Sequence, residues 1–289
     1  MIKRLLKILK RIMIGILSVV GVITLVGVTF INVSPQFGAG SKDVSLDRIR
    51  KSPNFLNGAF KNQELTKQMT GFKWKTIPQF FTDGNNKTPS KELPMEKLKK
   101  SYFENEPLQP RITWFGHSAA FVEMEGINIF IDPMLGDVPA PHPLLGSKRF
   151  QKELPISINS LPKIDVVLIS HDHYDHLDYG SIIKLNDNVD QFYVPLGIKA
   201  HLISWGVPEA KITEFDWWEN INYKGIDFMV FTQGVAGNKI FQGLRRLDVA
   251  NANYQTSILN RWTGEGSTNS YPRLSNSDPN GNYGKFSDH

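Results

Sequence analysis

The chain has 289 residues, a formal net charge of +5 at pH 7 and no cysteine, which excludes disulfide bonds and thiolate metal sites. Its first eleven residues hold five of the 33 basic side chains and none of the 28 acidic ones, so the rest of the chain is formally neutral. A neutral body offers no basic face for nucleic acid, and we expect no nucleic-acid partner.

An apolar run from Ile12 to Ile31 follows the basic N-terminus and is interrupted only by glycine, serine and threonine. These twenty residues suffice to cross a hydrocarbon core of about 30 Å as a helix. The alternative is a cleaved signal peptide, but its apolar core is usually about 7–15 residues long and a small-residue cleavage site follows it. We therefore predict that residues 1–33 form a single-pass anchor in the cell membrane. The basic flank predicts a cytoplasmic N-terminus and an extracytoplasmic main domain.

Residues 34–110 are polar, rich in Lys, Asn, Gln, Pro and Gly, and contain scattered aromatic residues. We interpret them as a partly ordered arm or stalk. The aromatic residues are Phe55, Phe60, Phe72, Trp74, Phe80 and Phe81. Their rings either pack on the main domain, which we favour, or lie at a membrane interface, where amphipathic rings are favoured.

The main domain begins at Arg111 with short apolar runs at 112–115, 120–123 and 127–131. Glu125 and Gly126 separate the last two, which indicates an antiparallel hairpin. Residues 132–150 are dense in proline and predict a loop.

Farther along, the pattern predicts strands at 164–170, 191–194, 211–215 and 227–232 and helices at 179–185 and 198–205. Strands that alternate with helices indicate a layered α/β domain, which we place at residues 111–232.

The segment 171–176 reads His-Asp-His-Tyr-Asp-His and directly follows the apolar strand that begins at Ile164. Imidazole nitrogens and carboxylate oxygens are the usual ligands of zinc. The candidate ligands are His171, His173, Asp175 and His176. The first two would face one ion and the last two a second. The alternative is a polar loop whose histidines are solvated, which this dense spacing disfavours.

The segment His171–Asp178 resembles the signature of the metallo-β-lactamase superfamily of metal-dependent hydrolases. Flanking motifs are similar to the branch that contains N-acyl-phosphatidylethanolamine-hydrolysing phospholipase D, and the ascorbate-6-phosphate lactonases are more distant. These motifs are Trp114–Ser118, Ile131–Met134, Pro195–Gly197 and Asp216–Glu219. The resemblance covers residues 111–232.

The resemblance implies a four-layer αββα sandwich and a hydrolase with two zinc ions. It implies a phosphodiesterase of phospholipase D type that attacks N-acyl-phosphatidylethanolamine-type lipids at the membrane. His171 and His173 would hold the first ion, and Asp175 and His176 the second. Asp175 would also act in catalysis by orienting the attacking water. A lactonase or another ester hydrolase is an alternative that uses the same metals.

The family's later ligands, two His and a bridging Asp, have no counterpart after Thr232, because the next histidine is His289. Residues 233–289 are rich in Asn, Ser and Gly, and we predict a largely disordered tail. The chain would then hold only the N-terminal half of the sandwich. Either it is a truncated or frameshifted, catalytically inactive membrane-anchored remnant, which we favour, or it completes the site differently.

Four further residues are weaker candidates. By the resemblance, His201 is a helical residue without a ligand role. His117 and His142 lie in loops near the site, where a hydrogen-bonded structural role is favoured over lining the pocket. Asp132 ends a strand and either orients a metal-binding histidine or caps a turn.

Overall fold

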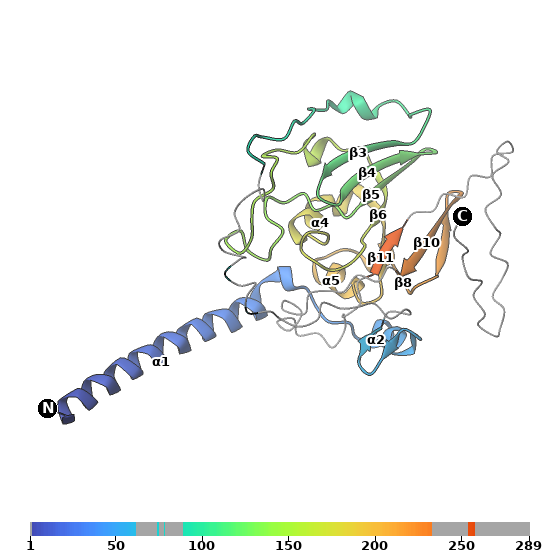
Figure 1. The fold of residues 1–289 in the computed structure, drawn as a ribbon. Coiled ribbons are helices and arrows are strands. Elements are labelled where there is room, and N and C mark those ends of the chain that lie inside the picture. The colour runs from blue at the N-terminus through green and yellow to red at the C-terminus, as the bar shows by residue number, and fades with distance from the viewer. Residues whose placement is uncertain (1, 62–73, 75–77, 79–88, 233–253, 258–289) are drawn as a thin grey trace, which may run out of the picture.

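A computed structural model of the chain describes residues 2–61, 74, 78, 89–232 and 254–257 (Figure 1). Helix α1 (Ile2–Val33) projects from the rest of the molecule as a single rod, and none of its 32 residues is buried. By length and composition α1 can cross a membrane, a property that a signal sequence shares. At 1.5 Å per residue its length is about 48 Å. The helix therefore exceeds the predicted apolar run by taking in the basic N-terminus.

A six-stranded mixed sheet forms the centre of the domain. Its strands lie side by side in chain order: β3 (Arg111–Gly116), β4 (Ala119–Met124), β5 (Ile127–Ile131), β6 (Ile164–Leu168), β7 (Val189–Pro195) and β8 (Ile212–Phe215). The first three are antiparallel neighbours, and β5 to β8 run parallel. Glu125 and Gly126 join β4 to β5 with positive φ angles of 48° and 70°, as the predicted tight turn requires. The α/β prediction is confirmed.

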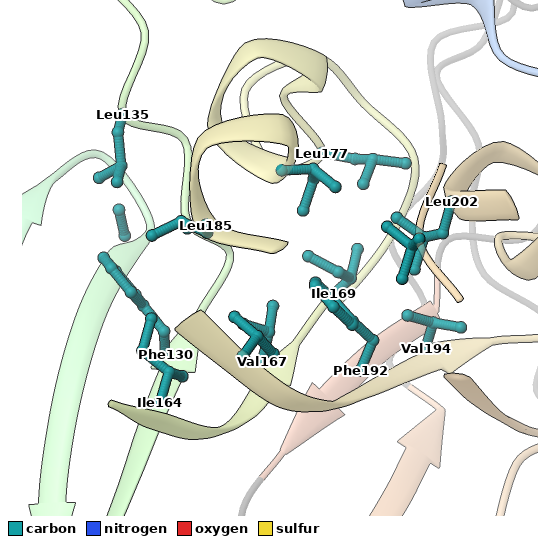
Figure 2. Close-up of a cluster of buried hydrophobic side chains, with 14 of the residues drawn as sticks. Phe130, Leu135, Ile164, Val167, Ile169, Leu177, Leu185, Phe192, Val194 and Leu202 are labelled. Carbon is teal, nitrogen blue, oxygen red and sulfur yellow. The ribbon is translucent and has the colours of Figure 1, made fainter. Parts of the chain in front are cut away.

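Helices α4 (Tyr179–Leu185) and α5 (Lys199–Ser204) cover one face of this sheet. Strand side chains alternate between the two faces, so that Val167 and Phe192 point towards the helices while Val166 and Tyr193 point away. Figure 2 shows side chains from the helical side meeting those of the strands in one apolar cluster. Because both faces are buried, the parallel strands are rich in apolar residues.

A second sheet packs on the opposite face. It has the order β11-β10-β9, with β9 at Asn220–Tyr223, β10 at Ile226–Thr232 and β11 at Tyr254–Ser257. The rings of Tyr193 and Phe228 lie 5.3 Å apart across the two sheets. Helices, central sheet and second sheet therefore stack as three layers of the expected αββα sandwich. Strand β11 departs from the predicted tail disorder; residues 233–253 and 258–289 lie outside the described residues.

The first part of the predicted arm packs on the domain. It contains helix α2 (Asp43–Lys51) and a hairpin of β1 (Phe55–Leu56) and β2 (Ala59–Phe60). Ile49 and Phe60 are buried in the apolar cluster that both sheets share. The favoured packing of the aromatic residues is thus confirmed at Phe60, whereas Trp74 is 78% exposed. Phe72, Phe80 and Phe81 lie outside the described residues.

Short 3-10 helices complete the described elements. They are η1 (Pro35–Phe37), η2 (Lys100–Phe103), η3 (Ile158–Ser160), η4 (Asn186–Asn188) and η5 (Glu209–Lys211).

Candidate metal centre

The predicted metal loop leaves the sheet where β5 and β6 end. Because the two strands are parallel, their carboxyl ends lie at one edge and bring Asp132 next to Ser170. The backbone N–H of Ser170 donates to Asp132 Oδ1 at 2.7 Å, and the N–H of Asp132 donates to the carbonyl of Leu168 at 2.8 Å. These bonds fix the start of the loop.

The other end of the loop is held by the core. Leu177 is 1% exposed and points into the apolar cluster (Figure 2). Its N–H and that of His176 donate to the carbonyl of His173 at 2.7 and 3.0 Å, which closes a turn. Asp178 then caps α4 by accepting the Ser181 N–H at 2.9 Å. The four candidate ligands therefore lie on a loop with both ends anchored.

His176 is oriented by a carboxylate. Its Nδ1 lies 2.7 Å from Asp132 Oδ2, which leaves Nε2 as the ligand atom. Nε2 in turn lies 3.6 Å from Asp175 Oδ2. Of the two roles considered for Asp132, the geometry supports the orienting one. The Asp132 side chain is only 4% exposed, which strengthens the interaction.

Ser170 gives His171 a similar orientation. The Ser170 hydroxyl donates to Asp132 Oδ2 at 2.6 Å, so its oxygen accepts from His171 Nδ1 at 2.9 Å. This tautomer leaves the lone pair on His171 Nε2 for a metal. Burial, with His176 and His173 nearby, lowers the pKa of His171 to about 4, so the ring is neutral at pH 7. Its ring centroid lies 4.5 Å from that of His173 and 3.9 Å from that of His176.

Asp175 lies among the histidines in its ionised form. Burial raises the pKa of its carboxyl, but the combined effect of His176, a backbone hydrogen bond, His117 and His173 lowers it overall. An ionised carboxylate can bind a cation or accept a proton.

His117 joins this cluster from the turn between β3 and β4. Its Nε2 lies 2.8 Å from Asp175 Oδ2, and one ligand atom each from His117, Asp175 and His176 all lie within 4.8 Å of one another. Ligand atoms at about 2.1 Å from a tetrahedral zinc ion are roughly 3.4 Å apart, so the three fit one ion after small movements. Sequence reasoning gave His117 a structural role; its place after a strand in the Gly116-His117-Ser118 motif was the available signal.

Two other histidines are not brought to the cluster. His201 is 3% exposed, and its Nδ1 accepts the N–H of Ala39 at 3.1 Å. His142 Nδ1 accepts the N–H of Leu144 at 3.2 Å within the proline-rich loop. Both make the structural hydrogen bonds expected for a histidine without a ligand role.

Residues 127–248 match the model of the beta-lactamase superfamily domain. The matched range includes the metal loop and the strands around it. This match supports the metallo-β-lactamase superfamily for that part of the chain. An uncharacterized protein of Mycobacterium tuberculosis is 33% identical over 175 residues, which cover 58% of this chain and 45% of that protein. N-acyl-phosphatidylethanolamine-hydrolyzing phospholipase D 1 of Caenorhabditis elegans is 32% identical over 116 residues, or 38% of this chain and 32% of that one.

The chain therefore spans less than half the length of either relative. Among solved structures, the diiron beta-hydroxylase CmlA from Streptomyces venezuelae aligns with 22% identity and a TM-score of 0.38, covering 57% of this chain and 30% of that one.

Proposed function

We propose that the chain is a zinc-dependent hydrolase that cleaves phosphodiester bonds in membrane lipids of the N-acyl-phosphatidylethanolamine type. The observation that carries the proposal is the convergence of imidazole and carboxylate ligand atoms in the loop after β6. His117, Asp175 and His176 gather there, directly beside His171 and His173. The nematode relative's name supports the substrate class.

The described donors supply three protein ligands for one ion and two for a second. His171 and His173 would hold one, and Asp175 and His176 the other, with His117 as a third protein ligand. Zinc there would activate water and neutralise negative charge on the phosphate oxygens. Asp175 orients the attacking water and accepts its proton, because it is ionised and lies between two histidines. Asp132 holds the proton on His176 Nδ1 and keeps that ring in position.

Helix α1 supports a membrane substrate. As an anchor it would confine enzyme and lipid to one surface, with the N-terminus in the cytoplasm and the domain outside it, in accordance with the basic residues at its start. Accessibility of single cysteines placed at position 3 and position 108 to an impermeant reagent, in intact and lysed cells, tests this orientation. Labelling of position 3 in intact cells would contradict it.

An inactive remnant remains the rival, favoured by the lack of histidine between Thr232 and His289. Metal content separates the two. We expect the purified full chain in detergent to retain zinc, and the His171→Ala, His173→Ala double variant to lose at least one ion. His142→Ala is the matched control, since the described hydrogen bonds of His142 lie within its own loop and its ring contacts Phe30, not the candidate ligands. If the unaltered chain retains no zinc, the hydrolase proposal fails.

Activity then decides the substrate class. The zinc-loaded chain should release phosphatidic acid from N-acyl-phosphatidylethanolamine in mixed micelles, and lose this activity when a chelator removes the metal. Turnover of a lactone or a carboxylic ester, without release of phosphatidic acid, would favour the lactonase or ester hydrolase alternative.

A further inference from the structure

The end of α1 reaches the metal loop through a series of aromatic contacts. The ring of Phe30, in the last turn of α1, lies 5.4 Å from that of Phe37 and 6.0 Å from that of His142. Phe37 lies 6.3 Å from Tyr174, which belongs to the metal motif itself. The helix terminus, the proline-rich loop and the metal loop are therefore neighbours, although more than a hundred residues separate the first from the other two.

Hydrogen bonds hold this junction against the domain. Trp205 Nε1 donates to the carbonyl of Pro35 at 2.7 Å, and the N–H of Ala39 donates to His201 Nδ1 at 3.1 Å. Gly38 has a φ of 62°, and a Cβ there would overlap the ring of His201. The chain between α1 and α2 is thus packed on the domain and does not act as a loose tether. Where α1 leaves a bilayer, the metal loop is held close by.

The proline-rich loop presents an apolar tip on an ordered base. The N–H of Leu145 donates to the carbonyl of His142 at 2.9 Å, and the N–H of Arg149 donates to the carbonyl of Asp137 at 2.9 Å. Met134, at the base, is buried. At the tip, however, Leu144 is 86% and Leu145 62% exposed. Such adjacent leucines, held outward by a structured turn, indicate a surface that something covers.

We propose that Leu144 and Leu145 insert into the bilayer leaflet from which α1 emerges and thereby direct the metal centre at lipid headgroups. The inference rests on the proposed anchor. Phe30 is three residues from the end of α1 and contacts His142, so His142 lies at the level where α1 meets the membrane surface. Two residues span at most about 7 Å, so Leu144 stays within reach of the interfacial region. The occupant of this surface is therefore lipid.

The experiment uses the full chain, which has no native cysteine, so a single introduced one takes a label at a known position. Three variants carry an environment-sensitive fluorophore: Leu144→Cys at the loop tip, Leu108→Cys as a fully exposed control before β3, and Val20→Cys in the middle of α1. Each is reconstituted in phosphatidylcholine nanodiscs with and without lipids that carry a spin-label quencher. The far-UV circular dichroism spectrum of each variant checks that the fold is intact.

We expect the spin-labelled lipids to quench the label at 144 several-fold more than that at 108, with a blue-shifted emission. Quenching at 20 but not at 144 would overturn the docking proposal while leaving the anchor in place. Absence of quenching at 20 would overturn the anchor and the docking together. Since no readout depends on turnover, failure of the proposed catalytic function would appear separately.

Discussion

The carboxyl edge of the parallel strands carries two polar clusters that differ in how their acidic groups are used. In the loop after β6, Asp175 lies beside His117 and His176, whose ring nitrogens could share an ion with it. At the end of β8, Glu214 is 6% exposed and its oxygens accept from the Gly197 N–H at 2.7 Å and the Ser45 hydroxyl at 2.6 Å. In the first cluster the carboxylate is surrounded by possible metal ligands. In the second, hydrogen bonds within the protein occupy the carboxylate oxygens.

The second cluster holds the segment after α1 onto the domain. Arg48, on α2, donates to the carbonyl of Glu214 at 2.8 Å, and Asn54 donates to Asp216 Oδ1 at 3.0 Å. Asp216 also accepts the N–H of Trp217 at 2.8 Å. The difference teaches that a carboxylate near this edge is a ligand candidate when its neighbours are themselves possible metal ligands, and not when backbone N–H and hydroxyl groups occupy its oxygens.

The largest effect on folding should come from Glu214→Ala. The change leaves the Gly197 N–H and the Ser45 hydroxyl unpaired in a buried place, which should lower the free energy of unfolding by about 3 kcal/mol. Zinc content of the folded protein should not change. Denaturant unfolding in detergent, followed by tryptophan fluorescence, measures the loss.

Glu209→Ala is the matched control for that change, because Glu209 is 70% exposed and its ion pair with Lys199 should contribute less than about 1 kcal/mol. An equal loss in both variants, or loss of zinc from folded Glu214→Ala, would erase the contrast between the two clusters.

For Asp132→Asn we expect the main effect on zinc binding and not on folding. Removing the carboxylate that orients His176 should weaken zinc binding by about 10–100-fold, as for other residues that orient metal-binding histidines. Competition with a fluorescent zinc chelator measures the affinity. Asp137→Asn, an exposed aspartate in the same loop, is the control and should leave it unchanged. A weakened zinc affinity in both would show a general charge effect instead of orientation.

Much of the domain could be predicted from the sequence because its signals are local. The Glu125-Gly126 turn and the run that begins at Ile164 correspond to β4–β5 and β6, and the predicted helix at 179–185 coincides with α4. The packing of α2 and the β1–β2 hairpin was not predictable, because it depends on partners such as Glu214 that are more than 150 residues away. The convergence of His117 on Asp175 was missed because it also depends on a contact between segments far apart in the sequence, and a single histidine after a strand is only a weak signal.

The smallest effect should come from Asp178→Ala, which tests where the metal cluster ends. Asp178 belongs to the same signature as the ligands, but its Oδ2 accepts from the N–H and hydroxyl of Ser181 and caps α4. Loss of this cap should lower the free energy of unfolding by about 1 kcal/mol. Unfolding and zinc affinity are measured as above, with Asp178→Ser, which retains a capping oxygen, as the control. A loss of zinc affinity without a change in stability would place Asp178 with the metal cluster, whereas an intact zinc affinity would confine that cluster to residues that precede Leu177.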